Sequence, residues 1–184
     1  PGEPPIISVV ATCGKEGTTP VRLRRESTWM IPSRVAGCTD AREYWESRHG
    51  RLDFENVYSV TEDPVLRREI IGLLTEALDP RTPCRILVPG CGARALLERD
   101  LVRSVPAWSI LATDYPRVAR AAAERLQHPR VAYCGKDTRA LELTAEYDAA
   151  VVINAVLSDS DVDNRAMLRS VYEAIRPGGF FIGL

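Results

Sequence analysis

The chain has 184 residues, of which 45% are hydrophobic and 27% charged, and its formal net charge is -1. This length and composition are typical of one globular domain with some attached N-terminal material. The near-neutral charge excludes a global field that would draw the protein onto nucleic acid, and no apolar run approaches the ~20 residues that span a bilayer.

The first 39 residues differ in character from the rest of the chain. Residues 6–12 and 21–25 have the composition of two short strands, and the turn-rich sequence Gly14-Lys15-Glu16-Gly17 lies between them. We therefore predict that residues 1–39 form an N-terminal appendage that contains a hairpin.

Residues 40–83 are predicted to form N-terminal helices that act as a lid. Residues 40–49 suit a short helix that carries Tyr44 and Trp45. Residues 65–77 place apolar side chains on one helical face, with Asp63 as the expected N-cap. The aromatic pair has two interpretations: a lid over the ligand through cation–π contacts, or plain packing against the sheet.

From residue 84 onward, apolar strands alternate with amphipathic helices. The predicted strands are residues 85–88, 109–113, 130–134, 149–153 and 180–184. The predicted helices are residues 93–102, 116–126 and 161–176, the last ended by Pro177-Gly178-Gly179. Strands that are apolar throughout indicate an α/β fold, a doubly wound, mostly parallel sheet with helices on both faces.

The loops after the strands carry the chemistry, because ligands of such sheets bind at the carboxyl ends of the strands. The first loop contains Gly90, Cys91 and Gly92, and the missing Cβ atoms of its two glycines allow close approach of a ligand or simply a tight turn. The second strand ends at Asp114, 22 residues beyond Gly92. A carboxylate there can accept both ribose hydroxyls of a nucleoside cofactor, or it can cap the next helix.

These two loops fit a nicotinamide enzyme as well as other nucleotide-binding proteins. The later loops separate them: Asp137 and Thr138 follow the third strand, Asn154 follows the fourth, and Arg176-Pro177-Gly178-Gly179-Phe180-Phe181 precedes the fifth. With these five motifs in order, residues 84–184 resemble the class I (Rossmann-like) S-adenosylmethionine-dependent methyltransferases.

The resemblance implies S-adenosylmethionine as cofactor and S-adenosylhomocysteine as product. Gly90, Cys91 and Gly92 would lie along the methionine part, and Asp114 would hold the ribose. Tyr115 would flank the adenine. Asp137 and Thr138 would meet the adenine edge, and Asn154 would lie beside the sulfonium.

Two positions depart from the family pattern. An acidic residue is common two positions before the first glycine, where this chain has Val88, and a glycine is common where it has Arg94. The departures leave open how the methionine amino group is held, and they keep a non-catalytic binding or scaffold protein as one alternative. The other alternative is an NAD-dependent oxidoreductase. The absence of a Tyr-x-x-x-Lys pair from this sequence argues against it.

The complete family fold has two further strands, so we expect this sheet to be truncated after its fifth strand. A bare apolar edge promotes aggregation. We expect a missing C-terminal segment or a partner chain to cover it, in preference to the N-terminal strands.

The predicted function is methyl transfer to a small-molecule acceptor, such as a natural-product intermediate. The loop after the fourth strand lacks the Asn/Asp-Pro-Pro-Tyr form that holds a flipped base, which argues against nucleic acid as substrate. The five cysteines include no Cys-x-x-Cys pair. We therefore predict no metal site and a cytoplasmic location. Of the two histidines, His49 is a weak candidate for a base and His128 is expected on the surface, so no catalytic base is assigned.

Overall fold

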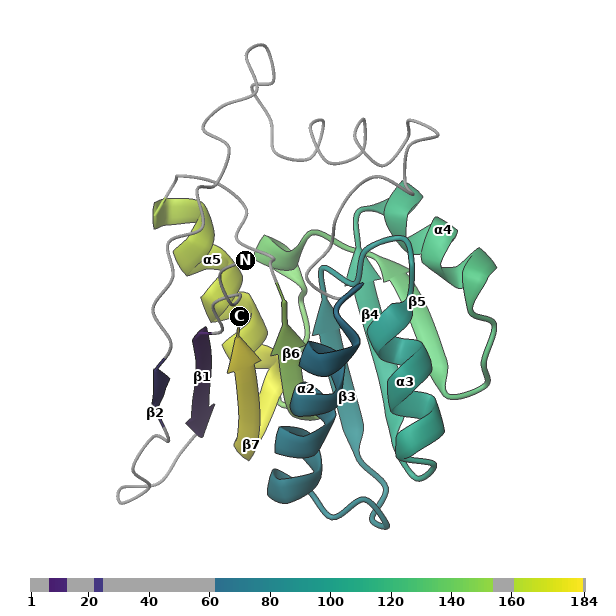
Figure 1. The fold of residues 1–184 in the computed structure, drawn as a ribbon. Coiled ribbons are helices and arrows are strands. Elements are labelled where there is room, and N and C mark those ends of the chain that lie inside the picture. The colour runs from purple at the N-terminus through teal and green to yellow at the C-terminus, as the bar shows by residue number, and fades with distance from the viewer. Residues whose placement is uncertain (1–6, 13–21, 25–61, 154–160, 184) are drawn as a thin grey trace, which may run out of the picture.

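The computed structural model describes residues 7–12, 22–24, 62–153 and 161–183, which form one sheet with helices on both faces (Figure 1). The strand order is β2-β1-β7-β6-β3-β4-β5. The five strands from β7 to β5 are parallel to one another, as predicted for the doubly wound core.

The strands are β1 (Ile7–Thr12), β2 (Arg22–Arg24), β3 (Arg85–Pro89), β4 (Ser109–Asp114), β5 (Val131–Gly135), β6 (Tyr147–Val152) and β7 (Ile175–Gly183). The described helices are α2 (Pro64–Ala77), α3 (Leu96–Ser104), α4 (Pro116–Arg125), α5 (Asp161–Ala174) and the short 3-10 turn η3 (Thr138–Ala140). The predicted helix at residues 40–49 lies outside the described residues.

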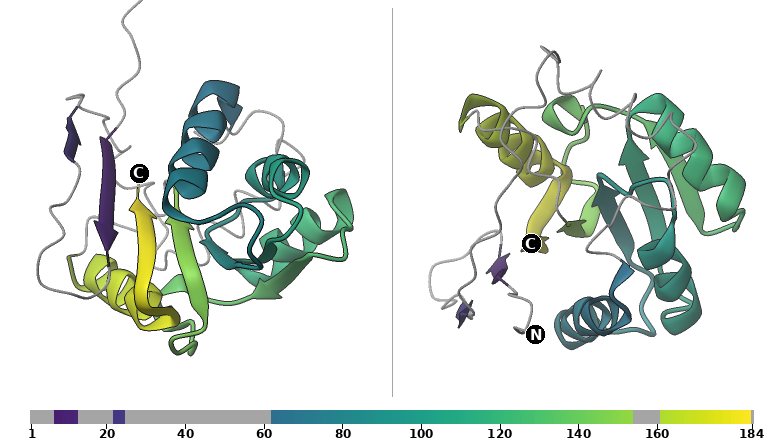
Figure 2. Two further views of the ribbon diagram at one scale, coloured as in Figure 1. Left: turned by 90° about the horizontal axis from the view of Figure 1, so that it is seen from below. Right: turned by 45° about the horizontal axis from the view of Figure 1, so that its top comes forward.

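Side chains of the central strand β3 alternate between the two faces of the sheet, so the core consists of two layers. In β3, Ile86 and Val88 pack with α2 and α3, whereas Leu87 packs with Met167 and Val171 of α5. Successive side chains of a strand point to opposite faces, so an entirely apolar strand must be covered on both. Figure 2 shows α5 on the opposite side of the sheet from α2 and α3.

Helix α2 follows the sequence prediction closely. Asp63 accepts a hydrogen bond from the Val65 amide at 2.8 Å, and Leu66, Ile70 and Leu74 are buried against the sheet. In α5, Met167, Val171 and Ala174 are buried, whereas Leu168 is 47% exposed.

The predicted ends of two helices are corrected by the structure. Helix α3 begins at Leu96 and not at residue 93, because Ala95 adopts a left-handed conformation with φ of 51° that a helix cannot contain. Helix α5 ends at Ala174, so Pro177-Gly178-Gly179 lies within β7. A Cβ on Gly179 would stand 2.8 Å from the Asp148 carbonyl oxygen, so only glycine permits β7 to approach β6 there.

The two N-terminal strands pair with each other, and β1 extends the sheet beyond β7. β1 pairs antiparallel with β2, and on its other side it pairs antiparallel with β7, matching Val10 with Ile182. Our preference for a missing segment or a partner chain beside β7 was therefore wrong. The third alternative, N-terminal strands folding back, is the arrangement observed.

Candidate functional site

The carboxyl ends of β3, β4 and β5 bring three predicted loops to the same edge of the sheet, the upper edge in Figure 1. These are the glycine loop of residues 90–95, the Asp114-Tyr115 junction, and the turn at residues 135–138. Parallel pairing accounts for this convergence, because every strand of the core ends at the same side.

The glycine loop is fastened to the end of β4 by its own backbone. The amides of Gly90 and Cys91 both donate to the Thr113 carbonyl oxygen, at 2.8 and 3.1 Å, and the Gly92 amide donates to the Asp114 carboxylate at 2.9 Å. Gly90 and Gly92 have φ of 69° and 67°, in the region that favours glycine. A Cβ on Gly92 would meet nothing within 4 Å, so a ligand has room to approach the backbone there.

Cys91 fills the space beneath this loop. Its side chain is buried, and burial raises the pKa of the thiol well above its ordinary value. A protonated, buried thiol is a poor nucleophile, so its role is packing.

Asp114, at the end of β4, places a buried carboxylate at this edge of the sheet. One carboxylate oxygen accepts the Gly92 amide and the other accepts the Tyr115 amide at 2.7 Å. Burial raises the pKa of Asp114 to about 6, although both hydrogen bonds favour its charged form. The first turn of α4 receives no side-chain cap, so this carboxylate is not serving that helix as its N-cap.

Tyr115 and Asp137 are both held in place beside Asp114. Tyr115 is buried and packs with Ala93 and Val118. The Asp137 carboxylate accepts hydrogen bonds from the backbone and the guanidinium of Arg139, the shortest being 2.6 Å from Nη2. Sequence reasoning missed this pair, which means that an adenine amino group would meet a carboxylate already bonded to arginine.

The two departures from the family pattern have distinct environments. Val88 is buried in the core and offers no charge to a ligand. Arg94 forms an ion pair with Glu62, at 2.6 Å between Nη1 and Oε1, which joins the glycine loop to the segment that precedes α2.

Five residues considered in the sequence analysis are not among those that the structure places on this edge. Tyr44, Trp45, His49 and Asn154 lie outside the described residues. His128 precedes β5, at the amino end of the strands, and its Nδ1 accepts the Arg130 amide at 3.2 Å, so it lies away from the glycine loop.

A buried carboxyl beneath the site was not anticipated. Glu98 of α3 is fully buried, and neither of its oxygens finds a hydrogen-bond partner within the part of the chain that the structure describes. Burial, together with a smaller effect of the charge of Asp114, raises the pKa of Glu98 to about 7. The helical periodicity of the sequence indicated this burial, because position 98 falls on the same helical face as Leu101, Val102 and Val105.

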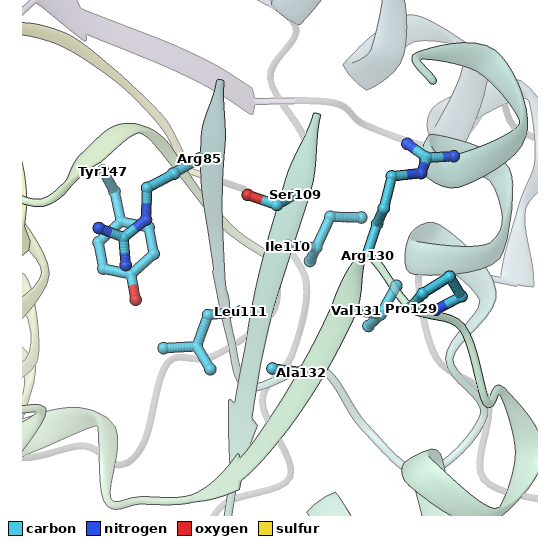
Figure 3. Close-up of a pocket in the computed structure, with 9 residues that line it drawn as sticks. All are labelled: Arg85, Ser109, Ile110, Leu111, Pro129, Arg130, Val131, Ala132 and Tyr147. Carbon is cyan, nitrogen blue, oxygen red and sulfur yellow. The ribbon is translucent and has the colours of Figure 1, made fainter. Parts of the chain in front are cut away.

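A surface depression of about 250 Å³ lies elsewhere, and Figure 3 shows its lining. Arg85, Ser109 and Tyr147, which begin β3, β4 and β6, border it, so it opens at the amino ends of the strands. Its two arginines are engaged: Arg85 forms an ion pair with Glu146, and Arg130 donates to three carbonyl oxygens in the last turn of α3 and the loop that follows it. We therefore place the candidate site at the carboxyl edge, where the loops converge.

Comparison with known proteins decides the family. Residues 71–183, more than half of the chain, match the model of the O-methyltransferase domain. The chain belongs to this family. No curated protein matches it in sequence.

Solved structures support the methyltransferase fold. A putative S-adenosyl-L-methionine-dependent methyltransferase from Methanococcus maripaludis is 19% identical, with a TM-score of 0.54 over 77% of this chain and 61% of that chain. A chain in the complex of the Haloferax volcanii Trm112 methyltransferase activator with a putative methyltransferase is 14% identical, with a TM-score of 0.59 over 78% and 59%. The cyclase SpnF is 24% identical, with a TM-score of 0.51 over 61% and 42%.

At these identities the likeness concerns the fold alone. This member of the O-methyltransferase domain family spans less than two thirds of the length of each of the three proteins. Within the described ranges, no helix has the length and apolar character needed to cross a membrane. The same ranges contain no group of three or more His, Cys, Asp or Glu side chains arranged for a metal ion.

Proposed function

We propose that the protein binds S-adenosylmethionine and transfers its methyl group to an oxygen of a small-molecule acceptor, releasing S-adenosylhomocysteine. The observation that carries the proposal is the buried Asp114 carboxylate, fixed at the tip of β4 by the amides of Gly92 and Tyr115. Open space beside Gly92 and a buried acceptor next to it suit a nucleoside ligand.

In this proposal Asp114 accepts the two ribose hydroxyls, and its buried position strengthens each charge-assisted bond. Tyr115, packed against Ala93 and Val118, would provide an apolar wall for the adenine. Asp137 and Thr138 would border the adenine edge. The backbone of Gly90, Cys91 and Gly92 would lie along the methionine part, and Asn154 would lie near the sulfonium.

The cofactor supplies a methyl group that its positive sulfur already activates, so the protein's task is alignment and exclusion of water. A hydroxyl acceptor must also lose its proton, whereas a carboxylate acceptor need not. His128 lies at the opposite edge of the sheet, so it is not the base. We therefore assign no base to the described residues.

Three observations support a small-molecule acceptor. The family is that of the O-methyltransferase domain, the net charge of -1 gives no attraction to nucleic acid, and the sequence Ile153-Asn154-Ala155-Val156 is not of the base-flipping type. We propose a natural-product intermediate as the methyl acceptor and the cytoplasm as the location of the protein. The fold alone does not decide the reaction, because the similar protein SpnF is named a cyclase.

The test is calorimetry with S-adenosylmethionine, S-adenosylhomocysteine and NAD, followed by transfer of a labelled methyl group to a panel of phenols and carboxylic acids. The Asp114→Asn variant is the control, because it keeps the shape of the side chain and removes its charge. We expect binding of both adenosyl ligands, none of NAD, and turnover with an oxygen acceptor. Binding without turnover against every acceptor would favour the scaffold alternative, and binding of NAD alone would refute the proposal.

A further inference from the structure

The ion pair between Arg94 and Glu62 lies at the ligand edge of the sheet. Glu62 directly precedes Asp63, the N-cap of α2, and only seven residues connect the end of α2 to the start of β3. Helix α2 therefore runs antiparallel to β3, and its beginning lies at the carboxyl edge, as Figure 1 shows. The pair thus spans the gap between α2 and the glycine loop.

Both side chains are partly shielded from water but reachable. Their exposed fractions are 33% for Arg94 and 27% for Glu62, and the bond between them is 2.6 Å long. The amides of Gly90, Cys91 and Gly92 all point toward β4, whereas the Arg94 side chain turns toward α2. The loop thus presents backbone donors to one side and a guanidinium to the other.

We propose that Arg94 and Glu62 bind the α-amino acid end of the cofactor, with the guanidinium on its carboxylate and the Glu62 carboxylate on its ammonium. This inference rests on the proposed function, because it needs the adenosine at Asp114 and the remainder of the ligand along the glycine loop. A zwitterion carries its two charges on one carbon atom, so an adjacent cation and anion match it. A guanidinium has five N–H donors and can serve two carboxylates at once.

The buried apolar side chain of Val88 supports this assignment. It occupies the position where the resemblance leads one to expect an acidic residue, so the ammonium group needs another anion. Glu62 is an anion at this edge that already faces a cation of the glycine loop. The ion pair also keeps the ligand-free site neutral, which limits the cost of shielding two charges from water.

The experiment compares two ligands that differ only in the amino acid end. S-adenosylhomocysteine carries the zwitterion, and 5′-methylthioadenosine keeps the nucleoside and the sulfur but lacks it. We expect the wild-type protein to bind S-adenosylhomocysteine at least about tenfold more tightly, as charge-assisted contacts imply. Arg94→Gln and Glu62→Gln should each reduce that ratio by about tenfold or more while the affinity for methylthioadenosine stays within about twofold.

Arg67→Gln is the matched control. It breaks the Arg67–Asp100 ion pair, which is also 2.6 Å long and connects α2 to α3. If Arg94 and Glu62 served only to attach α2, all three variants would change stability and leave the ligand ratio unaltered. That result would overturn the inference.

A measurement without variants keeps the test decisive if Arg94→Gln fails to fold. The wild-type protein should bind an analogue of S-adenosylhomocysteine that lacks the carboxylate at least about tenfold more weakly than the parent. Equal affinity for the parent, the analogue and methylthioadenosine would overturn this inference alone. Absence of binding for all three ligands would overturn the proposed function together with it.

Discussion

Replacing the buried Glu98 by glutamine should make the stability of the protein less dependent on pH. The folded protein raises the pKa of this carboxyl from its ordinary value of 4.5 to about 7, so the folded state binds its proton more tightly than the unfolded state. Stability from this group is fully present below about pH 4.5 and is lost as the pH rises toward 7. At about 1.4 kcal/mol for each pKa unit, the loss reaches about 3 kcal/mol above pH 7.

The assay is urea unfolding of the wild type and Glu98→Gln at pH 5 and pH 8. A buried amide carries its own cost, but that cost is the same at both pH values and cancels in the difference. We expect the variant to gain about 2–3 kcal/mol relative to the wild type between pH 5 and pH 8. Glu76→Gln, which removes the same charge from an exposed position of α2, is the control. An equal pH dependence for Glu98→Gln and the wild type would refute the reasoning.

Three further predictions concern the ligand edge. Asp114→Ala removes an acceptor of two charge-assisted hydrogen bonds, so calorimetry should show an S-adenosylhomocysteine affinity at least about tenfold lower in a protein that remains folded. Because burial raises the pKa of Asp114 to about 6, the affinity of the wild type should be constant above about pH 7 and fall as the pH drops below 6. Asp114→Asn should abolish this pH dependence, and a wild-type affinity that stays constant down to pH 5 would contradict the assignment. Gly92→Ala places a side chain at φ of 67°, which should cost about 1–2 kcal/mol in thermal unfolding and lower ligand affinity further, since its Cβ enters the open space. Unchanged affinity would mean that the ligand lies elsewhere.

The parallel core could be predicted from the sequence because its signals are local. Each strand is a short apolar run, and α2 shows its cap and its buried face within 15 residues. The partner of β7 could not be predicted in this way. Pairing of Val10 with Ile182 joins positions that no local pattern connects, so the preference for another covering segment was wrong.

The convergence of the candidate site residues at one edge of the sheet could be predicted from the sequence, but their detailed contacts could not. The glycines and Asp114 converge as their places after the strands require, and the amide of Gly92 bonds to Asp114. The hydrogen bonds from Arg139 to Asp137 depend on rotamers of a short turn that sequence patterns do not specify. Glu98 was missed because glutamate is seldom fully buried, and a charge is ordinarily assigned to the solvent face.

The antiparallel pair of β1 and β7 also constrains the order of folding. Residues 9–12 are synthesised about 170 positions before their partners at 180–183, so β1 cannot pair with β7 until those later residues have been made. Closing so long a loop carries a large entropic cost, which contacts within the parallel core must offset first. Strands β3 to β6 should therefore assemble first, and β1 should attach only after β7 has joined them.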